Sequence, residues 1–73
     1  MGKLFLHEAI AVALLGFSDR TASFEQICET IAKRDLYRKK NGHYPDCTQI
    51  RARVNKNLQW FNKRLPGAVQ LKQ

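Results

Sequence analysis

Long apolar runs, internal repeats and low-complexity tracts are all missing from this sequence. No stretch approaches the ~20 consecutive apolar residues that a membrane-spanning helix needs, which argues against a membrane protein. Apolar residues make up 44% of the chain and charged residues 26%, a balance typical of a soluble globular domain rather than of a disordered tail. The 73 residues therefore predict one small domain over residues 1–73, with little room for a deep substrate pocket. His7 and Glu8 interrupt the apolar stretch near the N-terminus, so we expect no secretory signal peptide.

The residue sets that carry catalysis or bind metals are also missing. Cys28 and Cys47 form no C-x-x-C motif, and His7 and His43 do not complete a metal-ligand spacing. The sequence offers no Ser-His-Asp or Cys-His set, no paired carboxylates in a plausible cleft and no phosphate-binding loop. We therefore expect no enzymatic activity, no metal and no cofactor. Helical spacing places both cysteines at small core positions, which predicts buried, reduced thiols, while a disulfide between them stays possible.

Acidic residues are scarce, and their scarcity is uneven along the chain. Thirteen Lys and Arg stand against six Asp and Glu, which gives a net charge of +7. Residues 1–32 hold two basic and four acidic residues, whereas residues 33–73 hold eleven basic and two acidic residues. A basic half beside a slightly acidic half indicates one surface that meets a polyanion. The alternative is that the excess charge only aids solubility.

Three helices are predicted from apolar spacing and capping motifs. Residues 4–17 have the apolar spacing of a helix that packs on more than one side. Thr21-Ala22 predicts a short extended link, and Ser23-Phe24-Glu25-Gln26 has the form of a capping box that begins a second helix over about residues 24–34. Asp46 and Gln49 have the same spacing and predict a third helix over about residues 47–58. The residues expected to face inward from the third helix are Cys47, Ile50, Val54 and Leu58.

A basic loop and a terminal hairpin complete the predicted elements. We expect Leu36 and Tyr37 to pack against the core, and residues 38–43 to form a basic loop that turns at Asn41-Gly42. Residues 60–65 are an aromatic and basic extended run, residues 66–67 are a turn, and residues 68–72 alternate with period two, which predicts a β-hairpin. Trp60 and Phe61 are expected to close the core rather than to stack on bases.

This order of elements predicts the fold class. A helix, a short strand, two further helices and a hairpin indicate an α+β fold that is mainly α with a small β-hairpin. Within that class we predict a winged helix-turn-helix with three helices and a C-terminal wing. In such a fold the last helix of the helix-turn-helix lies in the DNA major groove.

The chain also resembles the HARE-HTH domain, a winged-helix family found in Asx-like chromatin proteins, some restriction endonucleases and bacterial polymerase-associated proteins. The resemblance spans nearly the whole chain and rests on four stretches, residues 6–12, residues 18–27, Leu36-Tyr37 with Gly42-His43-Tyr44-Pro45, and residues 61–71 with their Leu-Pro-Gly. The chain departs from the family pattern at Gln49, where an apolar residue is usual, and at Tyr44-Pro45, where Thr-Pro is common. The resemblance implies binding of double-stranded DNA by a module that often recruits an attached enzyme or complex.

The predicted DNA-contacting residues fall on the third helix, the basic loop and the wing. The outward face of the helix is polar and cationic, with amides that can pair with adenine, arginines that can pair with guanine and a small residue that permits close approach. The basic residues of the loop and wing are expected to contact phosphates. The predicted set is Arg38, Lys39, Lys40, Thr48, Gln49, Arg51, Ala52, Arg53, Asn55, Lys56, Lys63 and Arg64.

A protein-interaction module is the alternative, because winged helices also bind proteins and a basic surface can meet an acidic partner. We expect a monomer with no membrane partner. Reduced cysteines and the absence of an export signal predict a cytoplasmic protein, which would lie in the nucleoid of a bacterium or the nucleus of a eukaryote.

Overall fold

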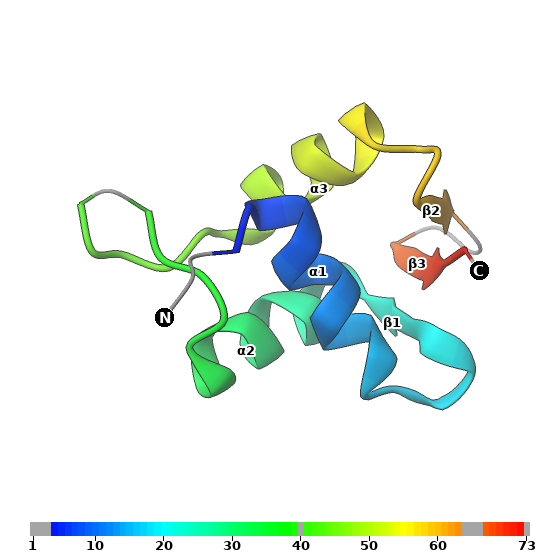
Figure 1. Ribbon diagram of the computed structural model, residues 1–73, viewed down its shortest axis with the longest axis horizontal. Helices are drawn as coiled ribbons and strands as arrows, with labels where there is room; N and C mark the ends of the chain where they lie inside the picture. The colour runs from blue at the N-terminus through cyan, green and yellow to red at the C-terminus, as the bar shows by residue number, and fades with distance from the viewer. Residues whose placement is uncertain (1–3, 40, 64–66, 73) are drawn as a thin grey trace.

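Three helices and a three-stranded antiparallel sheet make up the computed structural model, which describes residues 4–39, 41–63 and 67–72 (Figure 1). The α+β class predicted from the sequence is confirmed at this level. In chain order the elements are α1 (Leu6–Leu15), the short 3-10 helix η1 (Ser18–Arg20), β1 (Thr21–Ser23), α2 (Phe24–Arg34), α3 (Cys47–Lys56), β2 (Phe61–Lys63) and β3 (Ala68–Leu71).

The predicted capping boxes begin α2 and α3. The Ser23 hydroxyl accepts the Gln26 N–H at 3.0 Å, and the Gln26 side-chain oxygen accepts the Ser23 N–H at 2.9 Å. Likewise, the Asp46 carboxylate accepts the Gln49 N–H at 2.9 Å, and the Gln49 side-chain oxygen accepts the Asp46 N–H at 3.1 Å. Each box provides acceptors for N–H groups that have no partner within the helix, so both helices begin where the sequence predicted.

The predicted ends of two helices need correction. The first helix covers Leu6–Leu15 rather than residues 4–17, and the third ends at Lys56 rather than near residue 58. Leu58 was predicted to face inward but is 47% exposed. The chain turns after α3, where the Trp60 N–H donates to the Asn57 carbonyl at 2.9 Å, and a residue in this turn no longer follows the helical period.

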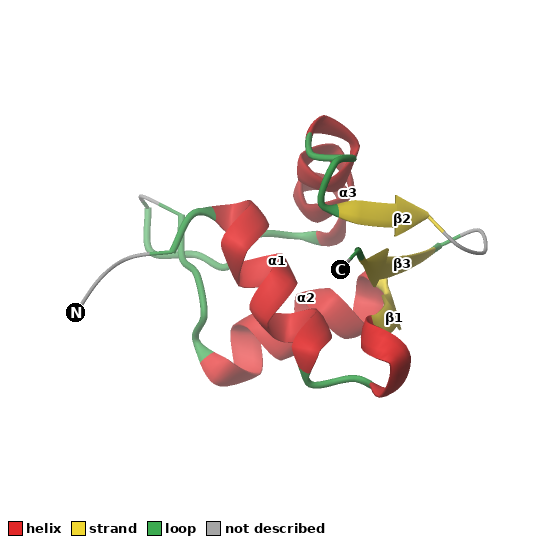
Figure 2. Cartoon of the chain, turned by 45° about the vertical axis from the view of Figure 1, so that its right-hand side comes forward, coloured by secondary structure: helices red, strands yellow, loops and turns green. Residues whose placement is uncertain are grey.

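Strands β2 and β3 form the predicted hairpin, and β1 pairs with β3 on the edge opposite β2. The strand order is β1-β3-β2, with Ala22 opposite Val69 on one side of β3 and Lys63 opposite Val69 on the other. The predicted turn residue Pro66 lies outside the described residues, and Gly67 has a φ of +83°, a conformation that favours glycine. The sheet lies at one end of the helices (Figure 2).

The core sits between the helices and the sheet. Its largest fully buried side chains are Phe61, Ile10, Leu14, Ile27, Ile31, Ile50, Val54 and Val69. Leu36 and Tyr37 pack against this core, as predicted. Phe61 closes the core, but Trp60 was wrongly predicted to do the same and is 39% exposed, because it lies in the turn before β2.

The two cysteines are free, as predicted, but they are only partly buried, so the prediction that they are buried is wrong. The Cys28 Sγ donates to the Pro45 carbonyl at 3.4 Å, which ties α2 to the chain just before α3. None of the helices in the described part of the chain has the length and apolar character needed to cross a membrane.

Candidate nucleic-acid interface

The outer face of α3 carries the residues that the sequence placed there. Ile50 and Val54 are fully buried, so the opposite side of the helix faces solvent. The predicted residues of α3 that are exposed are Thr48, Gln49, Arg51, Ala52, Arg53, Asn55 and Lys56. The helix thus presents three cationic side chains, and no acidic residue stands between Cys47 and Lys56.

A shallow groove brings the loop before α3 alongside this face. The groove encloses ≈ 210 Å³, and Lys39 lines it together with Arg53 and Lys56. The loop holds Lys39 through its own turn, because the Lys39 N–H donates to the His43 carbonyl at 2.8 Å and the Gly42 N–H donates back to the Lys39 carbonyl at 2.9 Å. Gly42 permits this turn with a φ of +86°. Three basic residues from two segments are therefore gathered on one side of α3.

The groove also contains residues that the sequence did not predict. Besides the predicted contacts Gln49 and Ala52, the groove is lined by Leu6, Tyr37 and Pro45, which were not predicted as contacts. Leu6 and Tyr37 were expected only as packing residues, and Pro45 only as part of the stretch Gly42-His43-Tyr44-Pro45. Pro45 is buried below the groove and fixes the chain just before α3 begins.

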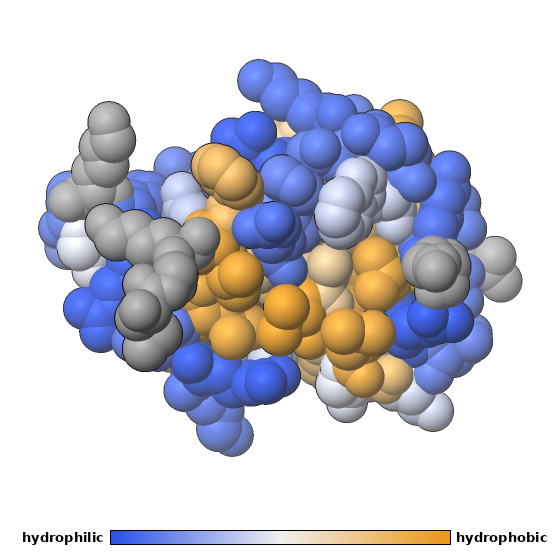
Figure 3. All heavy atoms as spheres, viewed as in Figure 1, coloured by the Kyte–Doolittle hydropathy of each residue, from blue (hydrophilic) through white to orange (hydrophobic). Residues whose placement is uncertain are grey.

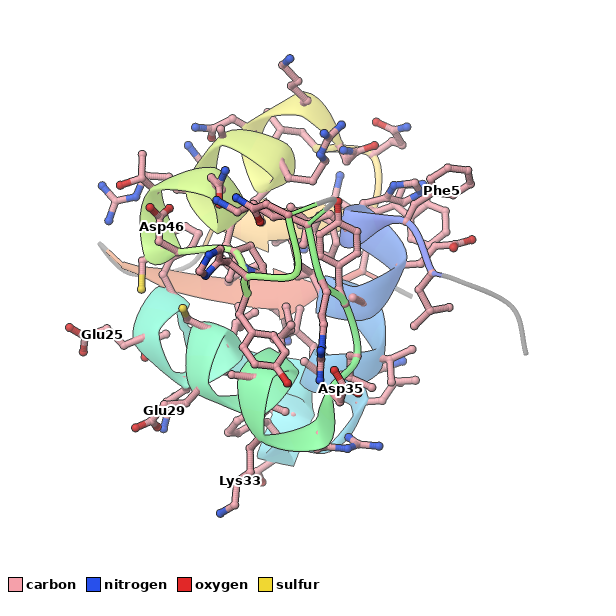
Figure 4. The ribbon with its side chains drawn as sticks, turned by 90° about the vertical axis from the view of Figure 1, so that its left-hand side faces the viewer. Phe5, Glu25, Glu29, Lys33, Asp35 and Asp46 are labelled. Carbon is pink, nitrogen blue, oxygen red and sulfur yellow. The ribbon has the colours of Figure 1, made fainter. Side chains whose placement is uncertain are left out.

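Arg38 is not brought to α3, although it neighbours Lys39 in the sequence. Its Nε donates to Asp35 Oδ1 at 2.9 Å, and the Tyr44 hydroxyl donates to the same oxygen at 3.1 Å. The guanidinium carbon lies 5.2 Å from the centroid of the Tyr44 ring. Hydrogen bonds from Arg38 and then from Tyr44 hold the pKa of Asp35 below its ordinary value. Asp35 lies at the far end of α2 from α3 (Figure 4), so a carboxylate already compensates the Arg38 charge there.

The opposite flank of α3 carries several carboxylates. Glu25 and Glu29 of α2 lie on the same side of the molecule as Asp46, which caps α3 (Figure 4). Partial burial, then a hydrogen bond with the Cys47 thiol and the charges of Asp46 and Glu29, raise the pKa of Cys28 to about 11. The flank of α3 toward α2 therefore holds three carboxylates with Arg51 as its cation, whereas Lys39, Arg53 and Lys56 lie on the groove side without an acidic neighbour among the lining residues.

Two predicted residues of α3 have local partners. The Arg51 guanidinium carbon lies 4.9 Å from the centroid of the Phe24 ring, so this side chain leans toward α2. The Gln49 side-chain oxygen accepts the Asp46 N–H in the capping box. A bidentate contact from Gln49 to adenine would need that oxygen, so it would break half of the box.

Of the wing residues predicted to contact DNA, only Lys63 lies within the described part of the chain. Lys63 is exposed at the end of β2 and lies opposite Val69 of β3. The predicted contacts Lys40 and Arg64 lie outside the described residues. No group of His, Cys, Asp and Glu side chains in residues 4–39, 41–63 and 67–72 is arranged to hold a metal ion.

Comparisons with family models, with curated proteins and with solved structures find no match to this chain.

Proposed function

We propose that this chain is a winged-helix domain that binds double-stranded DNA, with α3 in the major groove and the loop and wing on the phosphate backbone. The order of elements supports the winged-helix part of the proposal, because α2 and α3 precede a hairpin of β2 and β3. The short strand β1, which comes before α2, pairs with β3 and completes the sheet. The observation that carries the DNA-binding part is the cationic side of α3. Lys39, Arg53 and Lys56 line one groove, and no acidic side chain is among the described residues that line it.

The charge asymmetry of α3 sets the expected orientation on DNA. Phosphates are repelled by the edge that carries Glu25, Glu29 and Asp46 and attracted to the groove on the opposite flank. Ala52 lies among the exposed residues of this helix, where its small side chain permits close approach to base edges. Asn55 and Arg53 would then read bases, whereas Lys39, Lys56 and Lys63 would contact phosphates.

The first test is fluorescence anisotropy with a labelled mixed-sequence duplex at several salt concentrations. If about five phosphates are neutralised, the logarithm of affinity falls with the logarithm of salt concentration at a slope of roughly −4 to −5. Lys39→Glu, Arg53→Glu and Lys63→Glu should each weaken binding about tenfold or more, and the two lysine variants, which remove phosphate contacts, should reduce the slope by about one. Normal binding by all three variants would show that this surface is not the DNA site.

Lys33→Glu is the matched control. Lys33 is exposed in the last turn of α2 and points away from α3 (Figure 4), so the same charge reversal should change binding little. If Lys33→Glu weakens binding as much as the other three variants, net charge alone drives association. If heparin or an acidic peptide binds as tightly as duplex DNA at equal salt, the alternative of an acidic protein partner replaces this proposal.

A further inference from the structure

A second surface of the molecule is apolar and lies apart from α3. Phe5 is 69% exposed, Leu15 is 60% exposed and Trp60 is 39% exposed, although large apolar side chains normally find cover in a small soluble domain. Figure 3 shows apolar side chains gathered in the middle of one face, where Figure 1 places α1. The first helix packs on more than one side, as predicted, because it contacts α2, α3 and β3, but Leu15 at its end stays exposed.

Aromatic contacts join parts of this surface into a continuous row. The Phe5 and His7 rings stack with their centroids 6.0 Å apart, and the His7 and Trp60 rings meet edge to face at 5.1 Å. The row runs from the start of α1 to the turn before β2. These contacts hold Trp60 beside α1 while much of its surface remains open to solvent.

A wide hollow lies beside this row. It encloses ≈ 570 Å³, and Ala11, Leu15, Trp60 and Leu71 form its apolar lining. Its charged lining residues are Arg20 and Lys72, both exposed and both basic. The hollow shares no residue with the groove beside α3.

We propose that this hollow, which we call the α1 groove, docks an amphipathic protein helix that inserts large apolar side chains and places acidic residues against Arg20 and Lys72. The hollow is large enough for one or two large side chains, and a helix that lays its apolar face into such a groove is a common mode of recognition. The cationic rim favours carboxylates beside the apolar anchors.

Charge and shape decide between this occupant and others. A second copy would bring the Arg20 and Lys72 rims of two molecules together, and each chain carries a net charge of +7. A flat bilayer surface does not fill a hollow, whereas the ridge of side chains on a helix does. An acidic amphipathic helix satisfies both the apolar lining and the basic rim.

The test uses a panel of synthetic helical peptides without tryptophan. Each carries Leu or Phe anchors on one face, flanked either by Glu or by Lys. Trp60 is the single tryptophan of the chain, so its emission reports on the groove directly. We expect saturable binding of Glu-flanked peptides with a blue shift of Trp60 emission, and amide shifts at Ala11, Leu15 and Leu71 in NMR spectra.

Variants separate the rim from the lining. Lys72→Glu should weaken binding of Glu-flanked peptides about fivefold and should favour Lys-flanked ones. Leu15→Ser should abolish the Trp60 shift, and it is not expected to unfold the domain because Leu15 is already 60% exposed. Leu58→Ser is the matched control, since it removes an exposed leucine that does not line the groove.

Several results would overturn the proposal. These are no binding by any peptide at millimolar concentration, equal binding of Glu-flanked and Lys-flanked peptides, tighter binding to phosphatidylserine vesicles, and a dimer in sedimentation that Leu15→Ser disrupts. Because the two surfaces share no residue, Leu15→Ser should retain duplex binding, so failure here leaves the proposed DNA site untouched.

Discussion

The Asp46→Asn substitution should tighten DNA binding. Asp46 caps α3 by accepting the Gln49 N–H at 2.9 Å, and it places a carboxylate at the end of the helix that approaches DNA in helix-turn-helix proteins. Asparagine has nearly the same shape and caps helices about as well, so the change removes a charge and retains the cap. It therefore isolates the electrostatic contribution of one carboxylate.

The size of the effect follows from Coulomb's law. A phosphate about 8 Å from the carboxylate is repelled by about 0.5 kcal/mol at the dielectric constant of water and by about 2 kcal/mol at an effective value of about 20. These energies correspond to about twofold to thirtyfold tighter binding in the variant. Salt screens the repulsion over a Debye length of about 8–10 Å, so the gain should be larger at low salt.

Anisotropy with the same duplex at two salt concentrations measures this gain. Glu29→Gln is the control, because it removes one carboxylate from α2 rather than from the end of α3 and should change affinity less than Asp46→Asn does. Circular dichroism establishes that both variants keep their helices, since loss of the carboxylate at a helix N-terminus costs about 0.3–1 kcal/mol of stability. Unchanged or weaker binding by a folded Asp46→Asn variant would refute an approach of DNA to this end of α3.

Two further predictions concern titrating groups. The pKa of Cys28 is raised from 9.0 to about 11, so iodoacetamide at pH 8 should modify this thiol far more slowly in the native protein than in urea. Mass spectrometry measures both rates, and equal rates would contradict the raised pKa. Because the folded state holds this proton more tightly, the Cys28 contribution to stability is complete below pH 9.0 and is lost as the pH rises through about 11. The lowered pKa of Asp35 implies that its contribution to stability is present above the ordinary range of aspartate and is lost as the pH falls through the lowered pKa. A carboxyl NMR titration should show Arg38→Ala moving the pKa of Asp35 back toward its ordinary value, and identical titrations would exclude the hydrogen bond as the cause.

Local signals in the sequence were the most reliable guide to this fold. Both capping boxes occur as predicted because the groups that form them lie within four residues of each other, so distant contacts have little influence on them. The hairpin follows from alternation and a Pro-Gly turn, which are equally local. The sequence also indicated a short extended link at Thr21-Ala22.

Features that depend on distant segments were missed. The pairing of β1 with β3 joins Thr21 to Gln70, and no local pattern specifies that contact. Leu58 was assigned to the core because it fits a continued helical period, and Trp60 because a small domain needs aromatic residues to close its core. The chain turns after Lys56 to enter β2, which leaves both side chains partly in solvent. Hydrophobic spacing predicts which face of a helix a side chain lies on, but it does not predict where the helix ends.

The candidate site could be predicted only in part from the sequence. A sequence gives the number of charged residues, whereas binding depends on how those charges are arranged in space. Arg38 and Lys39 are adjacent and looked equivalent, yet the first is held by Asp35 and the second lines the groove beside Arg53 and Lys56. The Tyr44 hydroxyl, nine residues away in the sequence, donates a second hydrogen bond to the carboxylate that holds Arg38. Only the folded loop therefore distinguishes a cation that is already compensated from one that is available to a phosphate.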